Sequence, residues 1–258
     1  MTTPRNATTT NRGRTYKWRD EEFTSVTTIL SGGVPKPALT NWAAKSVAEY
    51  VAAHLAEVNA IAADDPAAAI DLMKGSPWRQ RDKAAAQGSD IHAWAEAHVL
   101  GKVMPEPPPA HRPYCDGFLR FLEDWRPTYQ MSEATVYNRA NAYAGTLDAI
   151  VEMDGDLWLI DYKTGKGVYG EVALQLSAYR SAEFIGLPDG TEAPMPEVDW
   201  CGVLHLTPDG YHLIPVEAGP DEFRAFLYAQ QVRNFAEYRS REVLGAPLPA
   251  PEREAVPT

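Results

Sequence analysis

The spacing of hydrophobic residues changes near residue 128 and divides the chain into a helical half and a sheet-forming half. In the first half, apolar residues recur at close to the helical period, as at Val47, Val51 and Leu55. This pattern predicts helices over residues 38–63, 66–73, 78–100 and 118–125. The Gly75-Ser76-Pro77 triplet predicts a break between the second and third helices, because proline interrupts helical hydrogen bonding.

After residue 128 the pattern changes to alternation and to runs of β-forming residues. Strands are predicted over residues 133–138, 143–153, 157–164, 200–206 and 211–216. Asp154-Gly155, between the second and third strands, is a strong signal for a two-residue hairpin turn. Helices are predicted over residues 170–185, with Gly186 placed to end the helix, and over residues 220–241. This order predicts an α/β or α+β core with a helical N-terminal portion.

The chain has 258 residues, which is enough to bury a full core in one domain. We expect a single domain over residues 15–242, with a mainly helical part over 15–127 and a sheet core over 128–242. Residues 1–14 are rich in Thr, Asn and Arg, and residues 243–258 are rich in proline. Both end segments are predicted to be disordered tails.

Composition and charge limit the classes of function. No apolar run approaches the roughly 20 residues that span a bilayer, and the first residues contain no apolar signal segment. We therefore expect a cytoplasmic protein that has no membrane partner. The net charge of −11, from 24 Lys and Arg against 35 Asp and Glu, argues against a protein that coats nucleic acid. This objection weakens if part of the acidity binds metal and if basic residues cluster, as they do at Lys74, Arg79, Arg81 and Lys83.

The two cysteines, Cys115 and Cys201, lie far apart in the sequence and form no Cys-x-x-Cys motif. Structural zinc sites and iron–sulfur clusters need about four ligands, usually thiolates, so the sequence fits neither kind of site. We expect two buried, reduced thiols.

The predicted hairpin brings three charged residues together. If Asp154 and Gly155 are the central turn residues, Asp148 lies opposite Asp161, with Cβ atoms roughly 4.5–5.5 Å apart. Lys163 shares the face of Asp161 because side chains alternate along a strand. Two facing carboxylates repel each other unless a cation lies between them, and a divalent ion such as Mg²⁺ could satisfy both. An ordinary Asp–Lys ion pair is the alternative, and a one-residue shift in register would turn Asp148 to the other face.

Four short motifs follow one another along the chain. In order they are Gly88-Ser89-Asp90-Ile91-His92, Gly145-Thr146-Leu147-Asp148, Asp161-Tyr162-Lys163-Thr164-Gly165, and Gln175 with Tyr179. Their order and spacing resemble the RecB-like branch of the PD-(D/E)XK nuclease superfamily. That branch includes nuclease domains of bacterial recombination helicases, CRISPR-associated exonucleases and phage recombination exonucleases. Residues 25–30 and 35–39 resemble phage-encoded members in particular.

The resemblance implies an α/β fold with a PD-(D/E)XK restriction-endonuclease-like core, in which helices flank a mixed central β-sheet. It also implies a role for each matched residue. His92, Asp148, Asp161 and the backbone carbonyl of Tyr162 would ligate Mg²⁺ or Mn²⁺. The catalytic residues would be Asp148, Asp161 and Lys163, with Lys163 activating or positioning the attacking water.

Three further residues take part in the resemblance. Gln175 and Tyr179, four residues apart on one helix face, would line the site or contact DNA. A solvated Gln175 and a core Tyr179 are the alternatives. Glu133 matches a position that is commonly acidic in the branch and has no assigned role.

The function that the resemblance implies is a metal-dependent DNA nuclease, and specifically an exonuclease in recombination, replication or DNA end processing. A virus-encoded enzyme acting in the host cytoplasm is expected, with DNA as substrate. Its protein partners would be a recombinase, a single-strand-binding protein or a helicase on a separate chain. An endonuclease of the same fold and a catalytically silent module that binds DNA or a partner are the alternatives. Many relatives carry four cysteines that hold an iron–sulfur cluster, and this chain lacks them.

Overall fold

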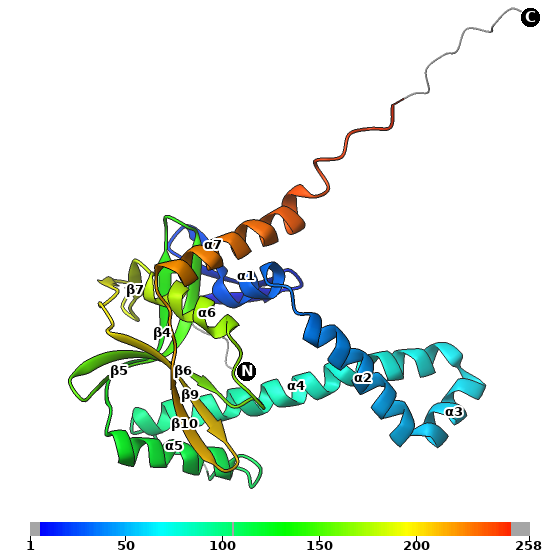
Figure 1. Cartoon of the computed structure of the whole chain (residues 1–258), viewed down its shortest axis with the longest axis horizontal. Coiled ribbons are helices and arrows are strands. Elements are labelled where there is room, and N and C mark those ends of the chain that lie inside the picture. The colour runs from blue at the N-terminus through cyan, green and yellow to red at the C-terminus, as the bar shows by residue number, and fades with distance from the viewer. Residues whose placement is uncertain (1–5, 105, 249–258) are drawn as a thin grey trace, which may run out of the picture.

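The structure is a computed structural model that describes residues 6–104 and 106–248. In chain order its elements are β1 (Ala7–Thr10), β2 (Gly13–Trp18), β3 (Glu21–Ser25), α1 (Val26–Gly33), α2 (Pro37–Ala53), α3 (Leu55–Asp64), α4 (Pro66–Val99), α5 (Arg112–Trp125), β4 (Thr128–Asn138), β5 (Tyr143–Met153), β6 (Asp156–Lys163), α6 (Glu171–Arg180), β7 (Phe184–Gly186), β8 (Glu192–Pro194), β9 (Trp200–Thr207), β10 (Gly210–Pro215), α7 (Pro220–Asn234) and the π-helical turn η1 (Phe235–Arg239). They form a mixed α/β fold around one ten-stranded, mostly antiparallel sheet that helices flank (Figure 1).

Strand β5 is the centre of the sheet, and two different strands share one of its edges. The other edge pairs antiparallel with β4 along nearly its whole length. On the shared edge, Tyr143 and Ala144 pair in parallel with β3, whereas residues 149–153 pair antiparallel with β6. Strand β6 then pairs in parallel with β9. Residues 145–148 therefore lie where the sheet forks into two wings.

The turn between β5 and β6 is the one predicted. Asp154 has a φ of 52° and Gly155 a φ of 88°, the pair of positive values that a type I′ hairpin turn requires. Met153 pairs with Asp156, and the ladder continues in the predicted register as far as Ala149 with Ile160. Beyond that pair, the two strands separate.

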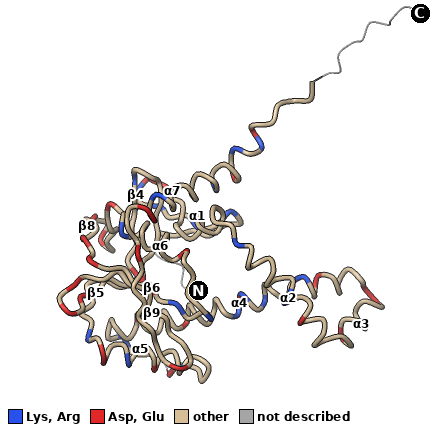
Figure 2. Tube along the Cα trace, in the orientation of Figure 1, with Lys and Arg blue, Asp and Glu red and all other residues tan. Residues whose placement is uncertain are grey.

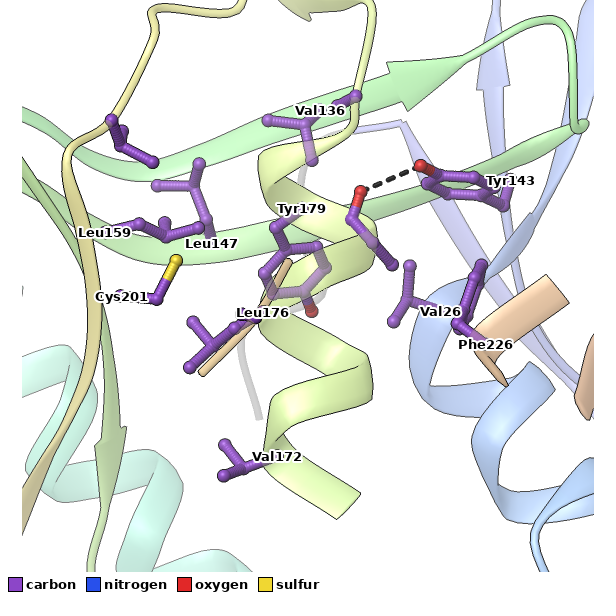
Figure 3. Close-up of a cluster of buried hydrophobic side chains, with 14 of the residues drawn as sticks. Val26, Val136, Tyr143, Leu147, Leu159, Val172, Leu176, Tyr179, Cys201 and Phe226 are labelled. Carbon is purple, nitrogen blue, oxygen red and sulfur yellow. Dashed lines mark hydrogen bonds between the residues drawn. The ribbon is translucent and has the colours of Figure 1, made fainter. Parts of the chain in front are cut away.

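Helices cover the two faces of the sheet and form two apolar clusters. The first cluster joins one face to α1, α6 and α7 and includes Val26, Leu147, Leu159, Leu176 and Phe226 (Figure 3). The second joins the opposite face to α5 and the C-terminal part of α4 and includes Ile91, Phe118, Phe121, Val151 and Ile160. Both cysteines are buried and form no disulfide, as predicted.

Helix α4 runs through the predicted break at Pro77, so the prediction of two helices here is wrong. A proline in a helix leaves the carbonyl four residues earlier without its usual donor, here the carbonyl of Met73. The hydroxyl of Ser76 donates to that carbonyl at 2.8 Å. The helix continues because this side chain replaces the missing backbone donor.

The predicted helix over residues 38–63 is instead two helices, α2 and α3, separated at His54. The imidazole of His54 stacks on Tyr50 with ring centroids 4.3 Å apart, and its Nδ1 lies 2.9 Å from the Tyr50 carbonyl. This side chain competes for a carbonyl of the last turn and ends α2. Helices α2 and α3 and the first half of α4 form an arm that projects from the core (Figure 1).

The prediction of a disordered tail over residues 1–14 is wrong for the part that the structure describes. Strands β1 and β2 form an antiparallel meander with β3, which pairs with β5. The meander packs against Tyr137 through Tyr16, Trp18 and Phe23. These contacts join residues far apart in the sequence, so no local sequence pattern predicts them. The part predicted to be mainly helical therefore also contains three strands. Residues 243–248 lie in no helix or strand, and residues 249–258 lie outside the described residues.

Helix α6 ends at Arg180, five residues before the predicted end, and Gly186 lies in strand β7. Val136 and Tyr137 of β4 pair with Ile185 and Phe184. This pairing takes the segment out of the helix. In the described part of the chain, no helix is long and apolar enough to cross a membrane.

We expect Ser76→Ala to lower the free energy of unfolding by about 1 kcal/mol, because the Met73 carbonyl loses its donor. In a Pro77→Ala background the same substitution should cost close to nothing, since the backbone N–H restored at position 77 can donate to that carbonyl. Urea unfolding of the four proteins in this double-mutant cycle measures the coupling. Equal costs in the two backgrounds would show that the Ser76 hydroxyl does not replace the helical hydrogen bond.

Candidate active site

The candidate site lies at the fork of the sheet, where β5 and β6 separate. Strand β5 supplies Asp148, and β6 supplies Asp161 and Lys163. Helix α4 reaches the fork from outside the sheet and brings His92, while α6 crosses it and brings Gln175. Residues predicted from four separate motifs are therefore brought together.

Asp161 is held by two side chains. The amide Nε2 of Gln175 donates to Oδ1 of Asp161 at 2.6 Å. The ammonium of Lys163, two residues along the strand, lies 2.5 Å from Oδ2. Asp161 is 3% exposed, so these contacts fix a buried carboxylate. The prediction that Asp161 and Lys163 share one face of the sheet is confirmed. Gln175 orients the Asp161 carboxylate from helix α6.

Asp148 bridges the separating strands. Its Oδ2 accepts a hydrogen bond from the backbone N–H of Tyr162 at 2.6 Å, and its Oδ1 lies 3.5 Å from Nδ1 of His92. Leu147 packs in the first apolar cluster, but Ala149, two residues later, packs in the second. Strict alternation would place both on one face, so the pattern reverses at Asp148. Its carboxylate lies between the strands, and the prediction that it shares a face with Asp161 needs this correction.

Glu133 belongs to the site, although the sequence analysis assigned it no role. Its neighbours on β4 pair with the neighbours of Asp148 on β5, so Glu133 faces Asp148. Its φ of 51° lies in the left-handed region, which costs a non-glycine residue about 1–3 kcal/mol. Glu133, Asp148 and Asp161 therefore form a row of carboxylates across three neighbouring strands. Counting the register from Asn138 opposite Tyr143 would have placed Glu133 opposite Asp148, because both residues lie inside the predicted strands.

The donor atoms suit a divalent cation. One ligand atom each from His92, Glu133 and Asp148 lie within 4.8 Å of one another. Oδ2 of Asp161 is buried and contacts the Lys163 ammonium at 2.5 Å, and a carboxylate oxygen has a second lone pair that can face a cation. Carboxylates favour Mg²⁺ or Mn²⁺, and the imidazole suits Mn²⁺ better. Of the predicted ligands, His92 and Asp148 are in this group and Glu133 joins them, while Asp161 is engaged by Lys163 and Gln175.

The rings of the two aromatic residues of the motifs, Tyr162 and Tyr179, pack in the apolar clusters. The hydroxyl of Tyr162 lies 2.9 Å from that of Tyr129, and its ring packs in the second apolar cluster. That its backbone carbonyl ligates a metal stays a prediction. Tyr179 is 3% exposed and packs in the first apolar cluster, which favours its alternative as a core tyrosine, but its hydroxyl lies 3.5 Å from Nε2 of Gln175. That Tyr179 lines the site or contacts DNA stays a prediction. A Cβ at Gly145 would lie 2.5 Å from the Tyr179 ring, so this close approach requires the glycine.

Burial and neighbouring charges shift the pKa of each group in the site. Burial disfavours the charged form of His92, but the Asp148 carboxylate outweighs it and raises the pKa of His92 to about 9. Burial and the charge of Asp148 raise the pKa of Glu133 to about 7. Burial raises the pKa of Asp161, whereas the charge of His92 overcomes burial and lowers the pKa of Asp148. Despite burial, the Asp161 and Asp148 carboxylates raise the pKa of Lys163.

Comparisons with known proteins identify no family. No family model matches the chain, and no curated protein matches it. Sixteen chains of solved structures are matched. One of them, described as "Crystal structure of SSO0001", is 13% identical, with a TM-score of 0.31 over 60% of this chain and 71% of that chain. An identity and a TM-score this low support no inference about fold or function. The geometry of the site described above is the basis for the proposals that follow.

We expect Glu133→Gln to stabilise the metal-free protein above pH 7. The pKa of Glu133 is raised from 4.5 to about 7, so the wild type loses stability as pH rises from 4.5 through 7. The variant has no carboxylate to ionise, and its advantage should be on the order of 1–3 kcal/mol at pH 8.5 and absent below pH 4.5. Urea unfolding in EDTA at both pH values tests this, with Glu152→Gln, an exposed position on β5, as control. A variant no more stable than wild type at pH 8.5 would contradict it.

Proposed function

We propose that this chain is a metal-dependent DNA nuclease with a PD-(D/E)XK core of the RecB-like branch. We propose further that it is an exonuclease in recombination, replication or DNA end processing. The observation that carries the proposal is the convergence of Asp148, Asp161 and Lys163 at the fork of the sheet, beside His92 and Glu133. Four sequence motifs that resemble one branch of nucleases supply four parts of a single site. An isolated Asp–Lys ion pair would require no such convergence.

The residues of the chain divide the work of phosphodiester hydrolysis. A Mg²⁺ or Mn²⁺ ion would be held by His92, Glu133, Asp148 and Asp161, where it would acidify a bound water and would neutralise charge that develops on the phosphate. The backbone N–H of Tyr162 fixes Asp148, and the amide of Gln175 fixes Asp161. These contacts hold the carboxylates in place before substrate arrives, which lowers the cost of ordering the site.

Lys163 acts as a cation in this mechanism. The carboxylates beside it raise its pKa, so it stays protonated at neutral pH. A protonated ammonium cannot accept the proton of the attacking water, but it can orient that water and stabilise a phosphate oxygen. Lys163 is therefore a positioning and charge-stabilising group.

With Mn²⁺ present, purified protein should degrade end-labelled linear DNA and leave closed circular DNA intact. Asp161→Asn and Lys163→Ala should each slow cleavage by about 100-fold or more, because each removes a charge that acts on the transition state. Asp154→Asn is the matched control, since Asn-Gly suits the same turn and lies outside the site. Cleavage of the circle would assign an endonuclease. If wild type degrades no DNA, the catalytically silent alternative holds.

Mn²⁺ should raise the melting temperature of the wild type. The stabilisation should reach about 2.7 kcal/mol at an ion concentration of 100 times Kd, because the ion binds only the folded protein. Asp148→Ala should abolish the shift. Gln175→Ala should retain most of it, because this residue orients a ligand and donates no lone pair to the ion. A shift that survives Asp148→Ala would remove Asp148 from the ligands.

A further inference from the structure

The middle of α4, residues 78–86, is exposed to solvent and is called the bare stretch below. Residues 78–86 are all exposed, whereas Ile91 and Ala95 are buried in the core and Ala69, Ser76 and Pro77 are buried in the arm. A helix that is solvated on every side links two packed bodies without being covered by either. Figure 1 shows this stretch crossing from the core to the arm formed with α2 and α3. Its surface is open to a ligand over its whole circumference.

The bare stretch and its flanks are basic in an acidic protein. Residues 74–87 contain four basic residues, Lys74, Arg79, Arg81 and Lys83, against the single acidic Asp82. The local charge of +3 contrasts with −11 for the chain. Figure 2 shows these basic positions along α4, apart from the acidic positions near α3. Such a local concentration of positive charge attracts phosphates despite the negative net charge.

Two of these cations lie on the same side of α4 as the metal-binding group. Arg81 precedes His92 by 11 residues, or about three turns, and Lys74 precedes it by 18, or about five turns. Lys83 precedes His92 by nine residues, or about two and a half turns, and so lies on the opposite side. Arg79 is engaged within the arm, because its guanidinium lies over the Tyr50 ring and donates to the Leu72 carbonyl, and it is therefore left out of this set.

An aromatic side chain interrupts the basic residues on this side. Trp78 precedes His92 by 14 residues, or about four turns, and is 47% exposed. The guanidinium of Arg81 lies 4.9 Å from the centroid of the Trp78 ring and also donates to Oδ1 of Asp82 at 2.6 and 2.9 Å, on a side chain that stays exposed. Basic residues interleaved with an exposed aromatic ring are typical of surfaces that bind single-stranded nucleic acid, where bases stack on the ring.

We propose that Lys74, Trp78, Arg81 and His92 define a track on α4 that binds a single DNA strand leading to the metal site. The proposal rests on the proposed nuclease function and names where its substrate lies. Lys74 and His92 are about 27 Å apart along the helix axis, which equals the rise of roughly eight nucleotides stacked as in one strand of B-form DNA, and fewer nucleotides of an extended strand. Because one continuous helix carries both residues, the distance from the basic residues to the metal site is fixed.

The test measures binding without cleavage. Fluorescence anisotropy with a labelled oligo-dT of about 20 nucleotides in EDTA gives Kd, and a duplex of equal length is the comparison. Lys74→Ala and Arg81→Ala should each weaken binding roughly fivefold at about 0.1 M salt and lower the salt slope by about 0.7. Lys83→Ala, on the opposite side of the same helix, should leave both values unchanged. Trp78→Ala should weaken strand binding at least about fivefold and affect the duplex less.

Cleavage measured beside binding separates this proposal from the one it rests on. Lys83→Ala should cleave a labelled single strand at the wild-type rate, because Lys83 lies outside the metal site and the track, whereas the Lys74→Ala/Arg81→Ala protein should cleave it more slowly at strand concentrations below Kd. If wild type cleaves no DNA, the proposed function fails. If wild type cleaves but these substitutions leave Kd unchanged, or if Lys83→Ala weakens binding equally, the track is overturned. An equal effect of Trp78→Ala on duplex and strand would also overturn the assignment of a single strand.

Discussion

The hydrogen bond from the Tyr162 backbone N–H to the Asp148 carboxylate is the interaction on which the rest of the site depends. As far as Ala149 and Ile160, strands β5 and β6 satisfy each other's backbone groups. At the fork the Asp148 carboxylate replaces a backbone carbonyl of β5 as the acceptor, and the backbone N–H of Tyr162 donates to it at 2.6 Å. An unpaired buried N–H would cost about 1–3 kcal/mol, so without this carboxylate the fork would be unfavourable. The Asp148 side chain thus allows β5 and β6 to separate, and its carboxylate lies between the separated strands.

The site concentrates features that destabilise a fold. Three carboxylates lie in a row across neighbouring strands, and one of them, Glu133, has a left-handed backbone conformation. His92 and Lys163 offset part of the repulsion, and their pKa values are raised as a result. Charge repulsion and backbone strain in one place are typical of functional sites, where the rest of the fold supplies the stability. A divalent cation would relieve this repulsion more fully than the two side chains do.

Helix α4 connects the chemistry of the fork to the surface that we propose binds DNA. Its C-terminal part is buried against the sheet and carries His92, and its first part packs with α2 and α3. The hydroxyl of Ser76 keeps the helix continuous past Pro77. Because the helix does not break, the arm and the site are parts of one rigid element. A net charge of −11 is an argument against DNA binding, but the basic residues at 74–83 of α4 give the protein a local positive charge that weakens this argument.

The sequence by itself determined the β5–β6 hairpin, its register as far as Ala149 with Ile160, and the common face of Asp161 and Lys163, but not the face on which Asp148 lies. These features depend on residues close together in the chain, where turn preference and side-chain alternation act directly. The tertiary structure alone decided that residues 7–25 form strands and that α6 gives way to β7. In both cases the deciding partner is distant in sequence: an open edge of β5 or of β4. Local patterns cannot report such partners, because they exist only once the sheet has assembled.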